Sequence, residues 1–505
     1  MRSLSAAIFL GAMIAMIVSS GCVVGPNYKK PAAPAPPAFK ESPPPDFKEA
    51  AAQGWKQAEP GDAYAKGRWW EIYKDPDLNA LEDQVAISNQ SVAELEATYR
   101  QAKAAVRVAR AALFPTVSAG PAITFSGSGN GSSAVGSTGT IVSGGAATTP
   151  SSVRQFYNLP VDVSWEPDLW GAIRRNLTAV VDTAQASAGD VENAKLLYQS
   201  ELASDYFQLH GIDGEIDLLT RTEASYQDYL TLTHNRFAGG VASDLDIAQA
   251  ETQLYGAQTS LIELGVQRAQ FEHAIAILIG KAPADVGVNA KPLTTTPPPV
   301  PVGLPSQLLE RRPDIAASER RVAAANEQIG IAIAAFYPTL TLSGGAGFES
   351  SSLAKWFTWP SRFWSVGPSL SETLFDAGRR SGIVAEERAA YDGTVATYRQ
   401  TVLTALQQVE DNLAALRILE TEAAKVADNL NAATRALNVS TDQYKAGTVS
   451  YLTVITAQAT LLNVQVTQVT LQSRRMVASV TLVQALGGGW DTSKLPSRAD
   501  ITERH

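Results

Sequence analysis

The sequence predicts a mainly α-helical chain of long antiparallel coiled-coil helices with four β-strands that contribute to a transmembrane β-barrel. Three observations predict this fold class. Two long stretches of the 505-residue chain contain no proline, four shorter segments alternate between apolar and polar residues, and the second half repeats landmarks of the first. Because unpaired backbone edges are not tolerated in lipid, four strands cannot close a barrel alone, so several copies must share one. Two copies would enclose a filled interior, whereas three would leave room for a lumen.

The chain begins with a predicted signal peptide, residues 1–21. Arg2 is followed by an apolar run over 6–18 and by Ser-Ser-Gly, which is the arrangement of a secretory signal. The run is shorter than the roughly 20 residues that a membrane-spanning helix needs. The surroundings of Cys22, the single cysteine, resemble a bacterial lipoprotein processing site, which predicts lipidation of Cys22. The alternative is an ordinary signal peptide with an incidental cysteine. Because Val23 is not Asp, analogy with bacterial sorting predicts the outer membrane.

Proline-free stretches over 168–282 and 369–495 predict long helices, because a proline in a helix interior costs roughly 3 kcal/mol. From Ile173 to Leu219 apolar residues recur about every 3.5 positions, which is the coiled-coil period. This pattern predicts a helix over about 172–236.

Each proline-free stretch is interrupted once, at 236–243 and at 443–450. A cation followed by Gly ends a helix and Ser begins the next, so each interruption predicts a tight reversal between antiparallel helices. The two reversals correspond residue by residue, which indicates an internal duplication. The predicted organisation is a signal peptide 1–21, a lipidated extended segment 22–68, repeat 1 over 69–280, an equatorial linker 281–312, repeat 2 over 313–486 and a C-terminal equatorial tail 487–505.

Four segments have the period of β-strands with one apolar side, at 116–126, 155–166, 339–349 and 363–374. Strands of about ten residues with this alternation are typical of membrane barrels. Trp356, Phe357 and Trp359 in the loop of the second hairpin are typical of an interface belt. The alternative is a pair of ordinary hairpins packed on a soluble core.

The composition argues against several classes of protein. A formal charge of −9 without a basic stripe argues against a nucleic-acid partner. One cysteine and four scattered histidines predict no metal site, and no motif predicts a catalytic residue or a cofactor. Arg312 with Pro313 is interpreted as a helix junction, and Asp168 lies where a strand passes into a long helix.

Five motifs stand in order along the chain: Gly21–Tyr28, Leu308–Ile315, Phe375–Arg380, Tyr444–Leu452 and Ala485–Trp490. Taken in this order, they resemble the outer-membrane efflux protein family, the TolC-like ducts, in its NodT-type lipoprotein branch. The resemblance implies a homotrimer with a twelve-stranded barrel in the outer membrane and an α-barrel tunnel through the periplasm. It also implies an equatorial region built from residues around 23–68, 281–312 and 487–505.

The same resemblance places the two reversals at a periplasmic tip, where a membrane-fusion adaptor docks and an inner-membrane pump delivers substrate. The candidates for adaptor docking are Arg236, Gly239, Gly240, Tyr444, Lys445 and Gly447.

Family members often narrow this tip with an apolar ring and an Asp ring. Leu452 stands at the apolar position, whereas Thr453 and Thr456 stand at the positions where Asp is frequent. In the first repeat, Asp244 and Asp246 begin the helix after the reversal. These two carboxylates are interpreted in one of two ways: as caps of the helix N-terminus, with Ser243 and Asp246 forming a capping box, or as gating residues.

The predicted function is that of a passive, lipid-anchored trimeric duct. It exports small molecules such as drugs and toxic compounds across the outer membrane, with energy from a proton-driven pump of the RND type. The chain is not predicted to be an enzyme. The alternatives are a duct for protein secretion in a type I system and a structural coiled-coil lipoprotein of the periplasm.

Overall fold

The computed structural model describes residues 23–41, 68–126, 154–300 and 307–502. The chain forms two compact units, which are described separately. Unit 1 comprises Met1–Lys29, Ala104–Val181 and Ala323–Asp392, and unit 2 comprises Lys30–Lys103, Asp182–Val322 and Gly393–His505. The lipidation candidate Cys22 and the loop after residue 126 lie outside the described residues, as does most of the predicted segment 22–68.

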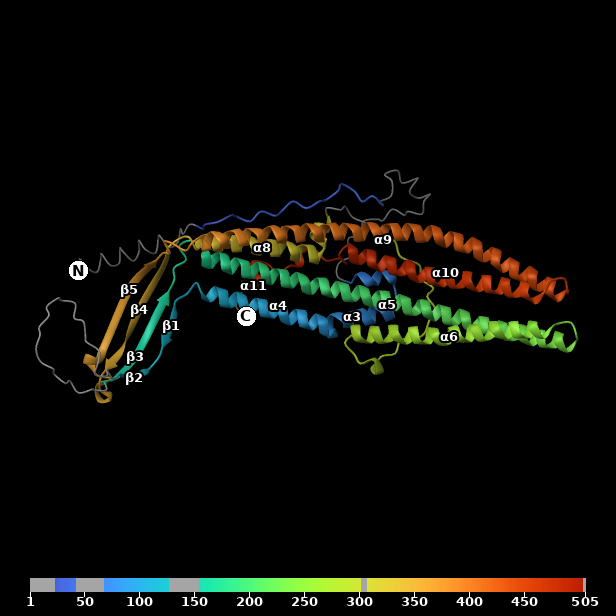
Figure 1. Ribbon diagram of the computed structural model, residues 1–505, viewed down its shortest axis with the longest axis horizontal. Helices are drawn as coiled ribbons and strands as arrows, with labels where there is room; N and C mark the ends of the chain where they lie inside the picture. Colours follow the sequence, from blue (N-terminus) through green and yellow to red (C-terminus); the bar gives the residue numbers. More distant parts are fainter. Residues whose placement is uncertain (1–22, 42–67, 127–153, 301–306, 503–505) are drawn as a thin grey trace, which may run out of the picture. The chain divides into compact units, whose positions relative to one another are not determined.

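Long helices dominate the described chain, and their lengths are equal in its two halves (Figure 1). α4 and α8 each have 22 residues, α5 and α9 each have 67, and α6 and α10 each have 35. The bounds are α3 Pro76–Ser88, α4 Gln90–Ala111, α5 Ala172–Ala238, α6 Asp244–Leu278, α7 Leu308–Arg311, α8 Pro313–Ala334, α9 Arg379–Lys445, α10 Tyr451–Ala485 and α11 Arg498–Thr502. None of these helices is both long and apolar enough to cross a lipid bilayer.

Two reversals join the long helices in unit 2, between α5 and α6 and between α9 and α10. Gly240 and Gly447 have φ angles of 75° and 79°, which glycine adopts without a steric penalty. In the first reversal the Ser243 side chain accepts from the backbone N–H of Asp246, and the Asp246 carboxylate accepts from the backbone N–H of Ser243. The predicted capping box is therefore present.

The main core of unit 2 lies where a short 3-10 helix η1 (Trp69–Tyr73) and α3 pack on α5, α6 and α10. Large aromatic residues dominate this core. Its fully buried members include Trp69, Tyr206, Phe207, Ile275, Met476 and Val480. The predicted helix junction at Arg312 is structural, because its buried guanidinium donates to Asp314, to Gln408 and to the carbonyl of Ala485.

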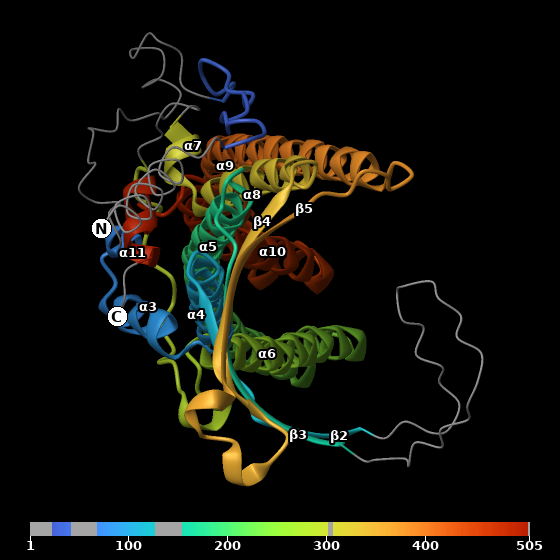
Figure 2. The same ribbon diagram turned by 90° about the vertical axis from the view of Figure 1, so that its left-hand side faces the viewer.

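Unit 1 contains one antiparallel sheet, which Figure 2 shows to be strongly curved. Its strands are β1 Thr116–Ala119, β2 Ala122–Ser126, β3 Arg154–Trp165, β4 Thr339–Ser350 and β5 Arg362–Ser371. The predicted strand 116–126 is divided into β1 and β2, both paired with β3, because Pro121 has no N–H to donate at the break. Pairing of β3 with β4 joins the two predicted hairpins into one sheet. Within the described residues, β1 with β2 forms one edge and β5 forms the other.

Candidate functional site

The sheet has one apolar face and one polar face. Residues directly opposite in the register share a face. The apolar face carries Val117, Ile123, Phe125, Tyr157, Leu159, Val161, Val163, Trp165, Leu342, Phe348, Trp364, Val366 and Leu370. The polar face carries Thr116, Ser118, Thr124, Asn158, Asp162, Ser164, Thr339, Thr341, Ser343, Glu349, Ser365, Ser369 and Ser371, with Phe156 and Phe363 among them.

The apolar face is exposed in a single chain. Trp364 and Val366 are 80% and 81% exposed, and Val117 and Leu370 are each 68% exposed. An exposed apolar surface that extends across the whole sheet is unfavourable in water, at about 25 cal/mol per Å². The predicted alternation is confirmed, and the exposed face fits hydrocarbon better than the interior of a soluble hairpin.

An aromatic cluster covers the turn between β4 and β5. The Trp356 indole N–H donates to the carbonyl of Phe348 at 3.2 Å, and its ring stacks on Phe357 with centroids 4.9 Å apart. Tyr157 packs on the same indole at 5.5 Å. Phe357 and Trp359 are 63% and 77% exposed, so this end of the sheet presents aromatic rings of the kind found at membrane–water interfaces.

Asp168 and Asp376 hold the starts of the two 67-residue helices. The Asp168 carboxylate accepts from the backbone N–H groups of Ile173 and Arg174 and from the Arg174 guanidinium. Hydrogen bonds from Arg380 hold the pKa of Asp376 below its usual value. Their geometry identifies both carboxylates as structural groups.

A buried ion pair fixes the N-terminal segment in unit 1. Arg175 is 3% exposed, and its guanidinium donates to Glu327 at 2.7 Å and to the carbonyl of Val24 at 2.7 Å. Gly25, at a φ of 98°, passes so close to Gly330 that a Cβ at residue 25 would lie 2.6 Å from the Gly330 Cα. Sequence reasoning missed this pair, because the partners are 152 positions apart.

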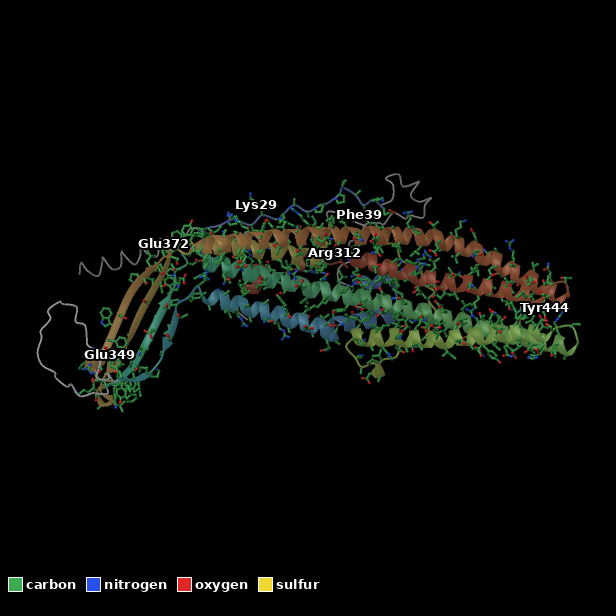
Figure 3. The ribbon with its side chains drawn as sticks, viewed as in Figure 1. Lys29, Phe39, Arg312, Glu349, Glu372 and Tyr444 are labelled. Carbon is green, nitrogen blue, oxygen red and sulfur yellow. The ribbon has the colours of Figure 1, made fainter. Side chains whose placement is uncertain are left out.

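Part of the N-terminal segment is also held against α9 in unit 2. The backbone N–H groups of Lys40 and Glu41 donate to the Glu410 carboxylate at 2.6 and 3.0 Å. Arg417 pairs with Glu41 at 2.7 Å, and Phe39, which directly precedes Lys40 and Glu41, is buried. Figure 3 labels Phe39 on this segment.

The two reversals meet in an aromatic cluster of unit 2. Figure 3 labels Tyr444 at this end of α9, and its ring is 4% exposed. The Arg236 guanidinium lies 4.5 Å from the centre of the Tyr444 ring, which in turn lies 5.3 Å from the ring of Tyr451. Burial raises the pKa of Tyr451 to about 12. Tyr444 therefore packs one hairpin against the other instead of facing outward.

The remaining docking candidates are accessible. Gly239, Gly240, Lys445 and Gly447 are exposed, and Arg236 is half-buried under its contact with Tyr444. The reversals therefore present backbone and one ammonium group on their outer surface, together with the exposed apolar side chains of Phe237 and Val241.

The gate candidates of α10 lie on one exposed strip. Leu452 is 56% exposed, and with Thr453, Thr456 and Thr460 it lines a groove of about 470 Å³ against small residues of α9. The Thr456 hydroxyl donates to the carbonyl of Leu452 at 2.9 Å. Asp244 is exposed, whereas Asp246 is engaged in the capping box.

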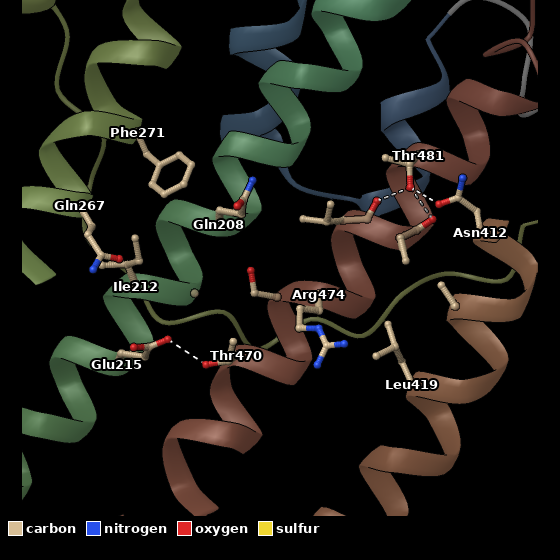
Figure 4. A pocket seen from close by; sticks show the side chains of 15 residues that line it. Gln208, Ile212, Glu215, Gln267, Phe271, Asn412, Leu419, Thr470, Arg474 and Thr481 are labelled. Carbon is tan, nitrogen blue, oxygen red and sulfur yellow. Dashed lines mark hydrogen bonds between the residues drawn. The ribbon is translucent and has the colours of Figure 1, made fainter. Parts of the chain in front are cut away.

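A second groove, of about 550 Å³, lies between the two hairpins farther from the reversals (Figure 4). Glu215 of α5 accepts from the Thr470 hydroxyl of α10 at 3.0 Å, and burial raises the pKa of Glu215. The Arg474 guanidinium lies 3.7 Å from Glu422. No local pattern in the sequence indicates this groove, because side chains of four helices line it. No three His, Cys, Asp or Glu side chains in the described chain are placed to bind a metal ion together.

The comparisons with known proteins agree on one family. The family model described as "Outer membrane efflux protein" matches residues 81–281 and 304–488. The toluene efflux pump outer membrane protein TtgC of Pseudomonas putida is 29% identical over 487 residues, 95% of each chain. The pyoverdine export outer membrane protein OpmQ of Pseudomonas aeruginosa is 29% identical over 452 residues, which cover 88% of this chain and 92% of the relative. The solved structure of the outer-membrane channel OprN matches with a TM-score of 0.82 at 26% identity, covering 93% of this chain and all of that chain.

Proposed function

The chain belongs to the outer membrane efflux protein family, and from this membership we propose that three copies form a passive duct for small molecules. The chain is the outer-membrane component of an efflux system, and it is not an enzyme. The observation that carries the proposal is the sheet of unit 1, which has one apolar face, one polar face and, among the described residues, two edges without a partner strand.

The edges require further copies. In lipid each unpaired backbone group costs several kcal/mol, so β5 of one copy must pair with β1 and β2 of another. Both pairs would be antiparallel, as every pair in the described sheet is. Three copies give a barrel wide enough for a lumen, whereas an interior of two copies would be filled by side chains.

The duct is passive in this proposal. The polar face is built mainly from hydroxyl groups and glycines, and no motif for binding a nucleotide is present in the sequence. Energy is supplied by an inner-membrane pump, which we propose to be a proton-driven pump of the RND type, through a periplasmic adaptor. The exposed reversals around Gly239, Gly240, Lys445 and Gly447 are the docking surface for that adaptor.

Small organic molecules are the proposed cargo. The names of the relatives describe toluene efflux and pyoverdine export, which favours this class over the proteins of a type I secretion system. A structural coiled-coil lipoprotein of the periplasm would not require a sheet with an exposed apolar face.

Single-channel recording of the purified protein tests the proposal. We expect heat-modifiable trimers that conduct ions in planar bilayers. A water-soluble, non-conducting monomer after removal of the lipid anchor would favour the structural lipoprotein instead.

We further propose that Cys22 is lipidated and becomes the first residue of the mature chain. The contacts of Val24 and Gly25 with unit 1 begin two residues after this position, so an acyl chain would be held close to the sheet. Cys22→Ser should abolish incorporation of labelled palmitate. Palmitate that still enters the Cys22→Ser protein would place the acylation at another residue.

Leu452 is the proposed apolar constriction of the tip. Leu452→Ser should raise the conductance of the isolated trimer, because a smaller hydroxyl group would replace an exposed apolar side chain and dewetting would weaken. Leu245→Ser is a matched control, since Leu245 is 64% exposed at the corresponding position of the first hairpin. Equal conductance of the Leu452→Ser and wild-type trimers would place the constriction elsewhere.

A further inference from the structure

One carboxylate stands in the middle of the polar face. Within the described strands, the charged residues are Arg154, Asp162, Glu349 and Arg362. Arg154 and Arg362 begin their strands, and Glu349 is the last residue but one of β4. Asp162 alone lies well inside a strand, opposite Ser118 on one side and Gly345 on the other.

The geometry around Gly345 directs this carboxylate over the sheet. A Cβ at residue 345 would lie 2.9 Å from the Asp162 Oδ1 and 3.4 Å from the Ser365 Oγ. Asp162 of β3 and Ser365 of β5 therefore flank Gly345 of β4 from its two sides, on the same face of the sheet. A side chain at residue 345 would displace the Asp162 carboxylate, so this position of the carboxylate depends on glycine at residue 345.

Asp162 has no evident structural role in the described part of the chain. Residue 162 is exposed, and its carboxylate makes no hydrogen bond or ion pair with another described residue. An exposed carboxylate without a partner adds little to stability, since even paired surface charges contribute about 0–1 kcal/mol. The small residues around Asp162 would accommodate a serine equally well.

We propose that Asp162 determines the charge selectivity of the barrel, favouring cationic over anionic solutes. The proposal rests on the proposed function, because it requires that the polar face line a shared lumen. In a trimer, three copies of Asp162 form a ring at one level of that lumen. The surrounding wall has a low dielectric constant, so it focuses the field of the ring and concentrates cations there.

Glu349 contributes less than Asp162 to this selectivity. It lies opposite Asn158, four residues along β3 from Asp162, which corresponds to about 13 Å of strand. That distance exceeds the Debye length of roughly 8 Å at physiological ionic strength, so the charge of Glu349 is largely screened from a solute at the level of Asp162. Glu349 also lies next to the turn that follows β4, near the first residues of β3. At this end of the sheet, bulk electrolyte screens the charge of Glu349.

Thiol modification from outside tests the proposal without opening the periplasmic tip. The reporter is the thiol of Ser365→Cys, whose rate of modification is measured. The rate measured with the parent protein is subtracted, so that any reaction at Cys22 does not count. Trimers in vesicles are treated with a cationic and an anionic methanethiosulfonate of similar size, and the ratio of the two rates is measured. We expect Asp162→Asn to lower the cation-to-anion ratio by roughly sevenfold, because a potential of about one kT per unit charge changes each of the two rates by roughly threefold in opposite directions, and Asp162→Lys to invert the ratio.

Two further variants make the test decisive. Glu349→Gln removes the same charge near the strand end and should change the ratio less than Asp162→Asn does. Trp364→Cys places the thiol on the apolar face, where both reagents should react slowly. An unchanged ratio in Asp162→Asn, with Ser365→Cys still reactive, would overturn the role of Asp162. A Ser365→Cys thiol that neither reagent reaches, with Trp364→Cys reactive, would instead contradict the lumen itself and hence the proposed function.

Discussion

Replacing Arg175 by methionine should lower the free energy of unfolding of unit 1 by about 3–5 kcal/mol. The guanidinium is the partner of Glu327 at 2.7 Å, and both side chains are almost completely buried. Without it the Glu327 carboxylate would remain buried and uncompensated, and the Val24 carbonyl would lose its donor. Urea unfolding of detergent-solubilised protein, followed by the fluorescence of the nearby tryptophans, measures the loss.

Arg174→Met is the matched control for this prediction. Arg174 is the neighbouring residue, and its side chain is 41% exposed in an ion pair with Asp168, so its loss should cost less than about 1 kcal/mol. The double variant Arg175→Met, Glu327→Gln should recover part of the stability, because the buried charge is removed. Equal midpoints for Arg174→Met and Arg175→Met would show that the buried pair does not stabilise unit 1.

A lysine on the apolar face should prevent assembly in the membrane, whereas a lysine on the polar face should not. Val366 lies in the middle of β5 and is 81% exposed. Val366→Lys places a charge against lipid, which costs about 2–4 kcal/mol at the bilayer midplane. The yield of heat-modifiable trimers in the outer-membrane fraction measures the effect.

Ser365→Lys is the control, because residue 365 is adjacent and lies on the opposite face. Its ammonium group would face water and lie near the Asp162 carboxylate, so trimers should form in normal yield. If Val366→Lys assembled as well as Ser365→Lys, the apolar face would not be in contact with hydrocarbon.

Local signals in the sequence predicted much of the fold. Gly240 and Gly447 predict the two reversals, because each reversal needs a residue with a positive φ angle and glycine adopts this conformation most easily. The absence of proline predicts the long helices, and α5 (Ala172–Ala238) differs from the predicted helix 172–236 only at its end. Strand alternation assigns the two faces correctly, because side chains alternate with a period of two.

Contacts between distant residues were not predictable from the same signals. The pairing of β3 with β4 joins segments from the two halves of the chain, and periodicity does not specify which strands are neighbours. Tyr444 was a docking candidate from its place in the reversal, but its burial depends on Arg236 and Tyr451 of other helices. Asp162 stands at a polar position in the alternation of the predicted strand 155–166, yet its place beside Gly345 emerges only from the register.

Disulfide crosslinking between strand edges tests most directly whether copies share one barrel. A cysteine at Ser118 on β1 is combined in turn with cysteines at successive polar-face positions of β5, from Ser365 to Ser371, and membranes are oxidised before denaturing electrophoresis. In one chain these edges are separated by β3 and β4, so a bond between them must join two copies. The account predicts a ladder of covalent species that ends at three chains. Single-chain bands for every pair, from a protein that conducts no ions, would contradict it.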